Sequence, residues 1–428
     1  MNNFWKLKGD RVIWIIIVFF AMISIAAVFS SSSYLAAKKD VAKTAIFLEQ
    51  TRSVLFGFCA LFLCYLIPLR FYRAFSFIIF GISIALLIML YVPAMQDERN
   101  GAVRGIKLFG VTFQVFEFAK IAVVLYLARA LEVWENNLYD FKQFALKILL
   151  PVGTVCLLIL PNSFSSALLV ALISFLILVF MDTSWKNIGI TVGIVAVMLL
   201  FSFGIYSAFV KGKPASELNG VEKVFNRFGT VEKRFRSFGA DDMEQTADMT
   251  AEEKARIEDE QRQSNNAKVA ISQGGLFGKG PGKSTQRYSL SMAFSDFIYA
   301  FIVEEYGLLL GGIGVIALYI MFQFRCIRLC ARCSQTFSSV TVAGLSFLIT
   351  CQAFLHILVN VRLIPITGHT LPLISHGGTA YLVLSGAFGI ILSVNKQLDK
   401  QLEADRQTQR QLEQAQNQIE QTQDQENE

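Results

Sequence analysis

The chain has 428 residues, of which 54% are hydrophobic and 17% are charged, and its mean hydropathy is +0.49. This composition excludes an ordinary soluble domain and is typical of a protein that crosses a membrane several times. The net charge of +6 is spread over loops between apolar runs. It therefore reports membrane orientation and suits anionic lipid headgroups, and it does not indicate nucleic-acid binding.

About ten apolar runs are long enough to cross a bilayer as helices, which takes roughly 17 to 25 residues. We place them at 12–30, 53–69, 74–93, 113–131, 144–160, 163–181, 188–210, 297–322, 337–359 and 371–394. The sequence therefore predicts an all-α polytopic membrane protein.

The basic residues give the orientation. Lys6, Lys8 and Arg11 precede the first run, which places the N-terminus in the cytoplasm by the positive-inside rule. That run is too long for a signal-peptide core and lacks a small-residue cleavage site, so we expect it to stay as a helix. With an even number of spans the C-terminus is also cytoplasmic, on the same side as the arginine-rich loop 325–332.

A long polar segment at 211–296 forms one large extracytoplasmic loop before the eighth span in this topology. Thr250 and Glu253 have the spacing of a capping box, so we expect a short surface helix to start there. The loop ends in a Gly-rich section with interleaved lysines, whose backbone amides and side chains suit phosphate oxygens.

The tail at 397–428 is rich in Gln and Glu. We expect it to be a disordered or transiently helical cytoplasmic tail that follows a transmembrane domain at 1–396.

The seven cysteines lie mostly in spans or in the cytoplasmic loop, so no disulfide framework is expected. The cluster "CIRLCARC" (326–333) lacks a second cysteine pair and sits beside arginines that oppose a cation. Acylated thiols suit it better than a metal.

Asp296 ends the polar loop and opens an apolar run. An ionisable group at this depth is costly and is by default a functional candidate. Its position also suits a helix N-cap, and position alone leaves both interpretations open.

Three stretches have to be considered together: 99–125, 271–312 and 356–389. The last concentrates prolines and glycines where it enters a span. Irregular backbone at membrane depth is tolerated only against protein or a water-filled cavity. The sequence therefore predicts a polar groove that opens outward.

The segments "QSNNAKVAISQGGLFGKGPGKSTQ", "SDFIYAFIVEEYGLLLGG" and "LIPITGHTLPLISHGG" resemble the signatures of the SEDS family of membrane glycosyltransferases. This is the FtsW/RodA group, which polymerises peptidoglycan from lipid II. The resemblance covers about residues 10–396 and is strongest to the division-type FtsW branch.

The resemblance implies that Asp296 is the catalytic base of an inverting β-1,4 glycosyl transfer. Cations would then stabilise the departing diphosphate, with Lys279 the first choice. The further candidates for substrate binding are Lys283, Gln286, Arg287, Arg104, Lys107, Glu117, Lys120, Arg362, Thr367, Gly368, Ser375, Gly377 and Gly378.

Four acidic and basic residues have a supporting role in this interpretation. Glu117 and Lys120 share one helix face at i, i+3 and are expected to pair. Glu304 and Glu305 are expected to tune Asp296 or to pack against polar partners.

No metal site with protein ligands is expected, although all three histidines (His356, His369 and His376) fall in the last stretch. No cofactor is required by the sequence. A Mg²⁺ or Mn²⁺ ion that bridges the substrate pyrophosphate remains compatible with it.

Two departures from the family pattern stand out. Arg104, Gly105 and Ile106 replace "RWI", which removes an aromatic contact. Arg362 stands where the family usually has Gly.

The expected function is peptidoglycan polymerisation in septal cell-wall synthesis, in the bacterial inner membrane. Two alternatives stay open: a flippase for lipid-linked precursors, and a non-catalytic division scaffold. The resemblance implies lipid II as substrate, and a class B penicillin-binding transpeptidase and division regulators as partners.

Overall fold

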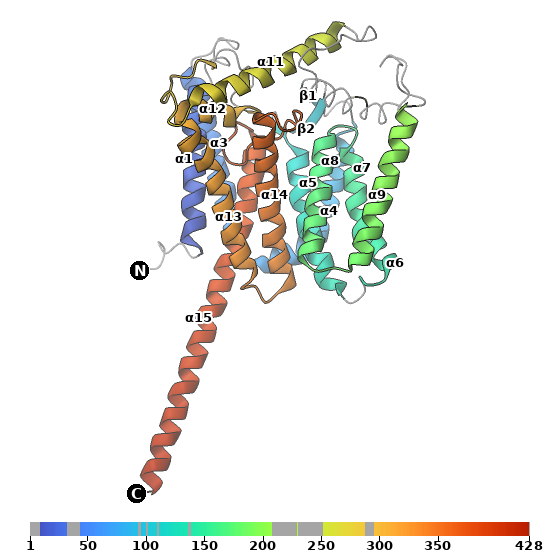
Figure 1. Cartoon of the computed structure of the whole chain (residues 1–428). Coiled ribbons are helices and arrows are strands. Elements are labelled where there is room, and N and C mark those ends of the chain that lie inside the picture. Colours follow the sequence, from blue (N-terminus) through green and yellow to red (C-terminus); the bar gives the residue numbers. More distant parts are fainter. Residues whose placement is uncertain are drawn as a thin grey trace.

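The structure is a computed structural model that describes residues 9–31, 43–92, 96–99, 102–108, 111–135, 138–207, 229, 251–286 and 295–427. It is a bundle of helices with a small sheet and one transverse helix at one end (Figure 1). The predicted all-α membrane fold is confirmed in its class.

A helix lies at each of the ten predicted runs. Their bounds are α1 Arg11–Ser31, α3 Lys43–Leu66, α4 Leu69–Met89, α5 Val115–Val133, α6 Phe141–Phe144 with η3 Ala145–Leu149 and α7 Leu150–Ile159, α8 Phe164–Phe180, α9 Trp185–Ile205, α12 Ile298–Tyr306 with η7 Gly307–Ile313 and α13 Gly314–Cys330, α14 Thr336–Asn360, and α15 Thr379–Asn427. Among the described helices, seven are long and apolar enough to cross a membrane, and two further apolar helices are shorter.

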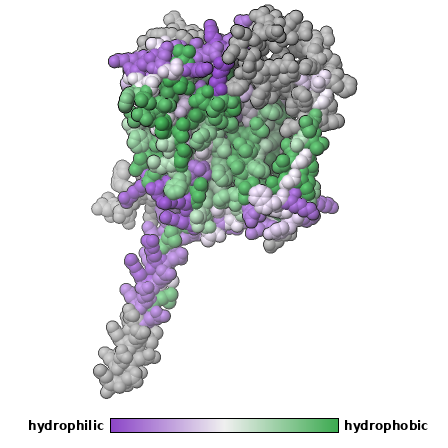
Figure 2. Space-filling view, viewed as in Figure 1, coloured by the Kyte–Doolittle hydropathy of each residue, from purple (hydrophilic) through white to green (hydrophobic). Residues whose placement is uncertain are grey.

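The hydropathy of the surface follows this arrangement. Figure 2 shows an apolar band between two hydrophilic ends. α11 (Ala251–Gly274) lies across one end, which we call the α11 end, and α15 leaves the bundle at the opposite end (Figure 1). Thr250 of the predicted capping box lies outside the described residues, and the helix is 24 residues long and not short.

α5 is the centre of the bundle. It packs against α4, α8 and α14, and nearly all of its side chains are buried, including the charged pair Glu117 and Lys120. A helix that is buried on every face needs no amphipathic pattern, which explains how polar residues can share it with a continuous apolar run.

The chain differs from the prediction at two places in its last quarter. The predicted run 371–394 becomes helical only at Thr379, because Pro372 and Gly378 (φ +53°) keep the preceding segment irregular. The tail, predicted to be disordered or transiently helical, continues α15 as one helix to Asn427 (Figure 1). Gln, Glu and Ala are good helix formers, and the described side chains from 400 to 414 are exposed.

A three-stranded antiparallel sheet precedes α5 and was not predicted. Its strands are β1 Gln96–Arg99, β2 Ala102–Leu108 and β3 Val111–Phe113, in the order β1-β2-β3. A Cβ atom at Gly105 would come within 2.8 Å of the Phe113 carbonyl oxygen. An aromatic residue at this position, as the family pattern has, would not fit this strand pairing.

The end of α14 explains a second departure from the family pattern. Arg362 N donates to Val359 O and Leu363 N donates to Leu358 O, which together form a Schellman motif. The residue at the centre of this motif adopts a left-handed conformation, and Arg362 does so with φ +57°. Glycine is favoured there because a Cβ atom in this region costs roughly 1–2 kcal/mol.

We therefore expect Arg362→Gly to stabilise the protein by about 1 kcal/mol, measured by thermal unfolding in detergent. Arg362→Ala is the matched control, because it also removes the Arg362 hydrogen bond to Asn265 but keeps a Cβ atom. Equal melting temperatures for the two variants would contradict the strain argument.

Candidate active site

The turn before α12 presents Asp296, which is half-buried at the α11 end. The interpretation of Asp296 as a helix N-cap is wrong, because the N-cap residue is Phe297 and makes no side-chain capping bond. Asn360 supplies the cap from α14 instead: its Oδ1 accepts from Ala300 N at 2.9 Å. A side-chain oxygen on the third helical amide is what an N-cap residue ordinarily provides.

Two side chains hold the backbone of this turn. Asn360 Nδ2 donates to Asp296 O at 3.0 Å, and Ser375 Oγ donates to Ser295 O at 3.0 Å. Ser375 Oγ also accepts from Leu371 N at 2.8 Å. The hydroxyl that was predicted to bind substrate is thus engaged in holding the turn.

α11 covers the same turn with a small apolar cluster. Ala267 and Ala270 of α11 pack with Phe297 of the turn, with Phe301 of α12 and with Val359 of α14. Small residues on α11 allow the helices to approach closely, so the Asp296 turn lies against a packed base.

The Gly-rich loop after α11 docks on the break between α12 and η7. Lys279 N donates to Glu304 O at 3.0 Å, and Leu308 N donates to Gly275 O at 2.9 Å. Side chains would prevent this approach: a Cβ atom at Gly278 would lie 2.3 Å from Glu305 O. The glycines serve close backbone packing here, and Gly278 also has φ +80°.

Half-buried Lys279 forms an ion pair with buried Glu304, with Nζ and Oε1 2.8 Å apart. The same Nζ donates to Gln273 Oε1 at 2.5 Å and to Thr285 Oγ1 at 2.7 Å. Thr285 N donates to Glu304 Oε1 at 2.9 Å, and Ser284 Oγ donates to Oε2. The three donors of Lys279 are therefore used by α11, by the loop and by α12, although Lys279 was the first choice for the diphosphate.

Glu305 ties the loop to α1. Its Oε1 accepts from Gly282 N at 3.0 Å and from Ser30 Oγ. Both glutamates therefore pack against polar partners and hold the loop to α12 and α1, which is one of the two roles predicted for them.

The predicted pair in α5 is confirmed. Lys120 Nζ lies 2.7 Å from Glu117 Oε1 and 2.7 Å from Gln352 Oε1 of α14. Gln352 Nε2 in turn donates to Thr370 O at 3.2 Å. This chain of contacts joins α5 through α14 to the irregular segment that contains Ser375.

The first and third stretches also meet directly. Gln114 Nε2 donates to Gly377 O at 3.2 Å, and Thr379 Oγ1 donates to Thr112 O at 2.7 Å. The structure thus brings the three stretches together at the α11 end.

The remaining predicted substrate-binding residues lie closer to the surface. Lys107 on β2 and Lys283 in the Gly-rich loop are exposed, whereas Gln286, Arg362, Thr367 and Gly368 are half-buried. Arg362 Nη1 donates to Asn265 Oδ1 of α11 at 2.7 Å. Arg287 and the side chain of Arg104 lie outside the described residues.

The histidines have separate partners. His356 Nδ1 contacts His369 O at 2.8 Å, and His376 Nδ1 contacts Gln50 Oε1 at 2.5 Å. Among the described residues, no group of His, Cys, Asp and Glu is arranged to hold a metal ion.

Asn360 and Gln352 were missed as site residues. With His356 they recur every fourth residue along α14, and all three are buried. This spacing places them on one face of the helix. A polar stripe in an apolar span is the signal that could have found them.

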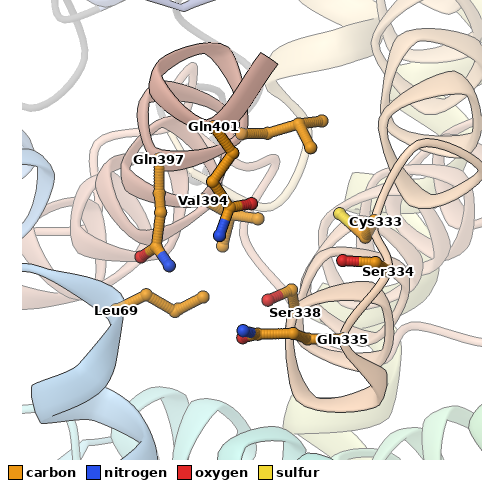
Figure 3. A pocket seen from close by; sticks show the side chains of 9 residues that line it. Leu69, Cys333, Ser334, Gln335, Ser338, Val394, Gln397 and Gln401 are labelled. Carbon is orange, nitrogen blue, oxygen red and sulfur yellow. The ribbon is translucent and has the colours of Figure 1, made fainter. Parts of the chain in front are cut away.

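A pocket lies at the opposite end of the bundle (Figure 3). It is lined by Leu69, Cys333, Ser334, Gln335, Ser338, Val394, Gln397, Leu398 and Gln401. Burial raises the pKa of the Cys333 thiol to about 11, which keeps it protonated at neutral pH. The pocket contains no group suited to proton abstraction and is remote from Asp296, so we do not assign it to the active site.

We expect Lys279→Ala to destabilise the protein by about 1–3 kcal/mol, because buried Glu304 would lose its counter-ion and one hydrogen bond. Thermal unfolding measures this, with Lys283→Ala as control, since Lys283 is exposed in the same loop. Equal loss of stability in both variants would show that the ion pair does not fasten the loop.

The family model FTSW_RODA_SPOVE, described as "Cell cycle protein", matches residues 10–400. A "Probable peptidoglycan glycosyltransferase FtsW" of Geobacter sp. (strain M18) is 24% identical over 392 residues, which is 91% of this chain and 97% of the relative. Its counterpart in Hydrogenovibrio crunogenus is 28% identical over 379 residues, covering 87% of this chain and 88% of the relative.

Solved structures share the fold. A chain in "Structural coordination of polymerization and crosslinking by a peptidoglycan synthase complex" matches with a TM-score of 0.66 at 20% identity, over 92% of this chain and 99% of that one. The rod shape determining protein RodA of Thermus thermophilus matches with a TM-score of 0.60 at 21% identity, over 92% and 98%.

Proposed function

Because the chain belongs to the FtsW/RodA/SpoVE family of cell-cycle proteins, we propose that it is a peptidoglycan glycosyltransferase that joins lipid II units. The names of its relatives support this activity over most of the chain. The observation that carries the mechanism is the position of Asp296, on a braced turn at one boundary of the apolar band. A lipid-linked sugar would be presented at this boundary.

We propose Asp296 as the general base. Its carboxylate takes the proton from the acceptor sugar hydroxyl as that oxygen attacks the anomeric carbon of the donor. The bond from this carbon to the lipid pyrophosphate breaks on the opposite face, and the pyrophosphate leaves with the bonding electrons. The product is a β-1,4 link with inverted configuration.

The leaving pyrophosphate needs positive charge near it. Lys283 and Lys107 are exposed at the α11 end and fit this role, as does half-buried Arg362. Lys279 shapes the loop through Glu304 in this proposal, and contacts to phosphate come from its neighbours. A divalent ion on the pyrophosphate would be carried mainly by the substrate, and no step depends on it.

We propose that the protein is a multi-pass protein of the bacterial inner membrane, with the α11 end outside, and that it acts at the division septum. The basic residues at the other end agree with this orientation, including Arg325, Arg328 and Arg332. A class B penicillin-binding transpeptidase is the proposed partner. A fold relative solved within a peptidoglycan synthase complex supports it.

The test is polymerisation of lipid II by the purified protein together with its transpeptidase. We expect Asp296→Asn to lower the rate by about 10²–10⁴-fold, the usual contribution of a general base. Asp259→Asn is the matched control, because it removes a carboxylate from the surface of α11 at the same end, and its rate should stay within about twofold of the parent, a surface change.

Equal polymer from the parent and Asp296→Asn would remove Asp296 from the mechanism. Translocation of lipid II in vesicles without polymer would favour a flippase. Normal division with an Asp296 variant would favour a scaffold.

A further inference from the structure

Asn360 is a buried amide that hydrogen-bonds to the Asp296 turn, to the first turn of α12 and to its own helix. Its Nδ2 donates to Asp296 O at 3.0 Å and to His356 O at 2.8 Å, and its Oδ1 accepts from Ala300 N at 2.9 Å. The side chain is fully buried. Burying an amide is costly unless its groups are paired, and here they are.

Ser375 acts on the same turn from another element. Its hydroxyl, which is also buried, donates to Ser295 O. The Ser295 carbonyl belongs to the peptide plane before the Asp296 Cα, and the Asp296 carbonyl belongs to the plane after it. Peptide units are planar, so holding both carbonyls fixes the backbone torsions of Asp296 and the direction of its Cα–Cβ bond.

We infer that Asn360 and Ser375 are positioning residues that aim the Asp296 carboxylate at the acceptor hydroxyl. Neither side chain has to touch substrate for this role. Catalysis by proximity is sensitive to the position and orientation of the catalytic group. A misplacement of that group by about 1 Å can lower the rate roughly 10²-fold. The inference rests on the proposed function, because it assumes that Asp296 is the base.

The structure offers a matched control. Asn187 at the start of α9 is also buried, and its Nδ2 donates to Leu138 O at 2.9 Å and to Tyr139 O at 3.2 Å. It braces a loop between α5 and α6, at the end opposite α11 (Figure 1). Asn187→Ala therefore removes an equivalent buried amide without touching the Asp296 turn.

The experiment measures kcat and KM for lipid II polymerisation, and the melting temperature, of the full chain with its transpeptidase. We expect Asn360→Ala to lower kcat by about 10- to 100-fold with KM within about twofold, because substrate binding does not need the aimed carboxylate. Ser375→Ala should lower kcat about 10-fold, and Ser375→Thr should recover part of it by restoring the hydroxyl.

Asn360→Asp tests the orientation of the Asp296 carboxylate separately from the capping of α12. It keeps an acceptor for Ala300 N but places a second acceptor against Asp296 O, so we expect a kcat no higher than that of Asn360→Ala. Asn187→Ala should lose comparable stability and keep kcat within about twofold, as expected for a site remote from the chemistry.

The inference is overturned if Asn360→Ala and Ser375→Ala both keep parental kcat, or if their kcat falls only as far as that of Asn187→Ala. If Asn360→Ala does not fold, the kcat values of Ser375→Ala and Ser375→Thr alone decide whether the inference holds. Loss of activity in Asp296→Asn together with full activity in these variants refutes the positioning role but leaves the proposed function. Full activity in Asp296→Asn refutes the proposed function itself.

Discussion

The α11 end depends on one constraint: the two amides on the buried face of α14 have to be paired. Gln352 and Asn360 lie two turns apart on this face, with His356 between them. Their partners are Lys120 of α5, the His369 carbonyl and the Asp296 carbonyl. An unpaired amide at this depth would cost several kcal/mol. The stripe therefore draws three distant stretches of the chain to one place.

A second constraint acts through the backbone. α12 ends at Tyr306, and the helix continues only after the π-helical turn η7. The break leaves the Glu304 and Glu305 carbonyls to accept from the Gly-rich loop, at 3.0 and 2.9 Å. The side chains of the same two glutamates bind that loop from the other side. The loop and the helix thus pair each other's hydrogen-bonding groups. These bonds hold the loop without an apolar core of its own.

The sequence predicted what depends on local pattern. Apolar runs located the helices, and i, i+3 spacing predicted the Glu117–Lys120 pair. It could not predict partners that only the tertiary fold brings near. Lys279 was expected to face phosphate, but its nearest anion, Glu304, lies 25 residues away in the chain. The cap on α12 likewise comes from Asn360, 60 residues after Ala300, and no local rule anticipates it.

The uninterrupted length of α15 has a mechanical consequence. Its first residue, Thr379, is bonded to the β3 strand that leads into α5, and its last described residue is Asn427. The part beyond the bundle, about 30 residues at 1.5 Å each, is a rod of roughly 45 Å. A continuous helix is stiff along its axis. A push or twist applied to its far end would therefore arrive, across the full thickness of the apolar band, at strand β3 at the α11 end.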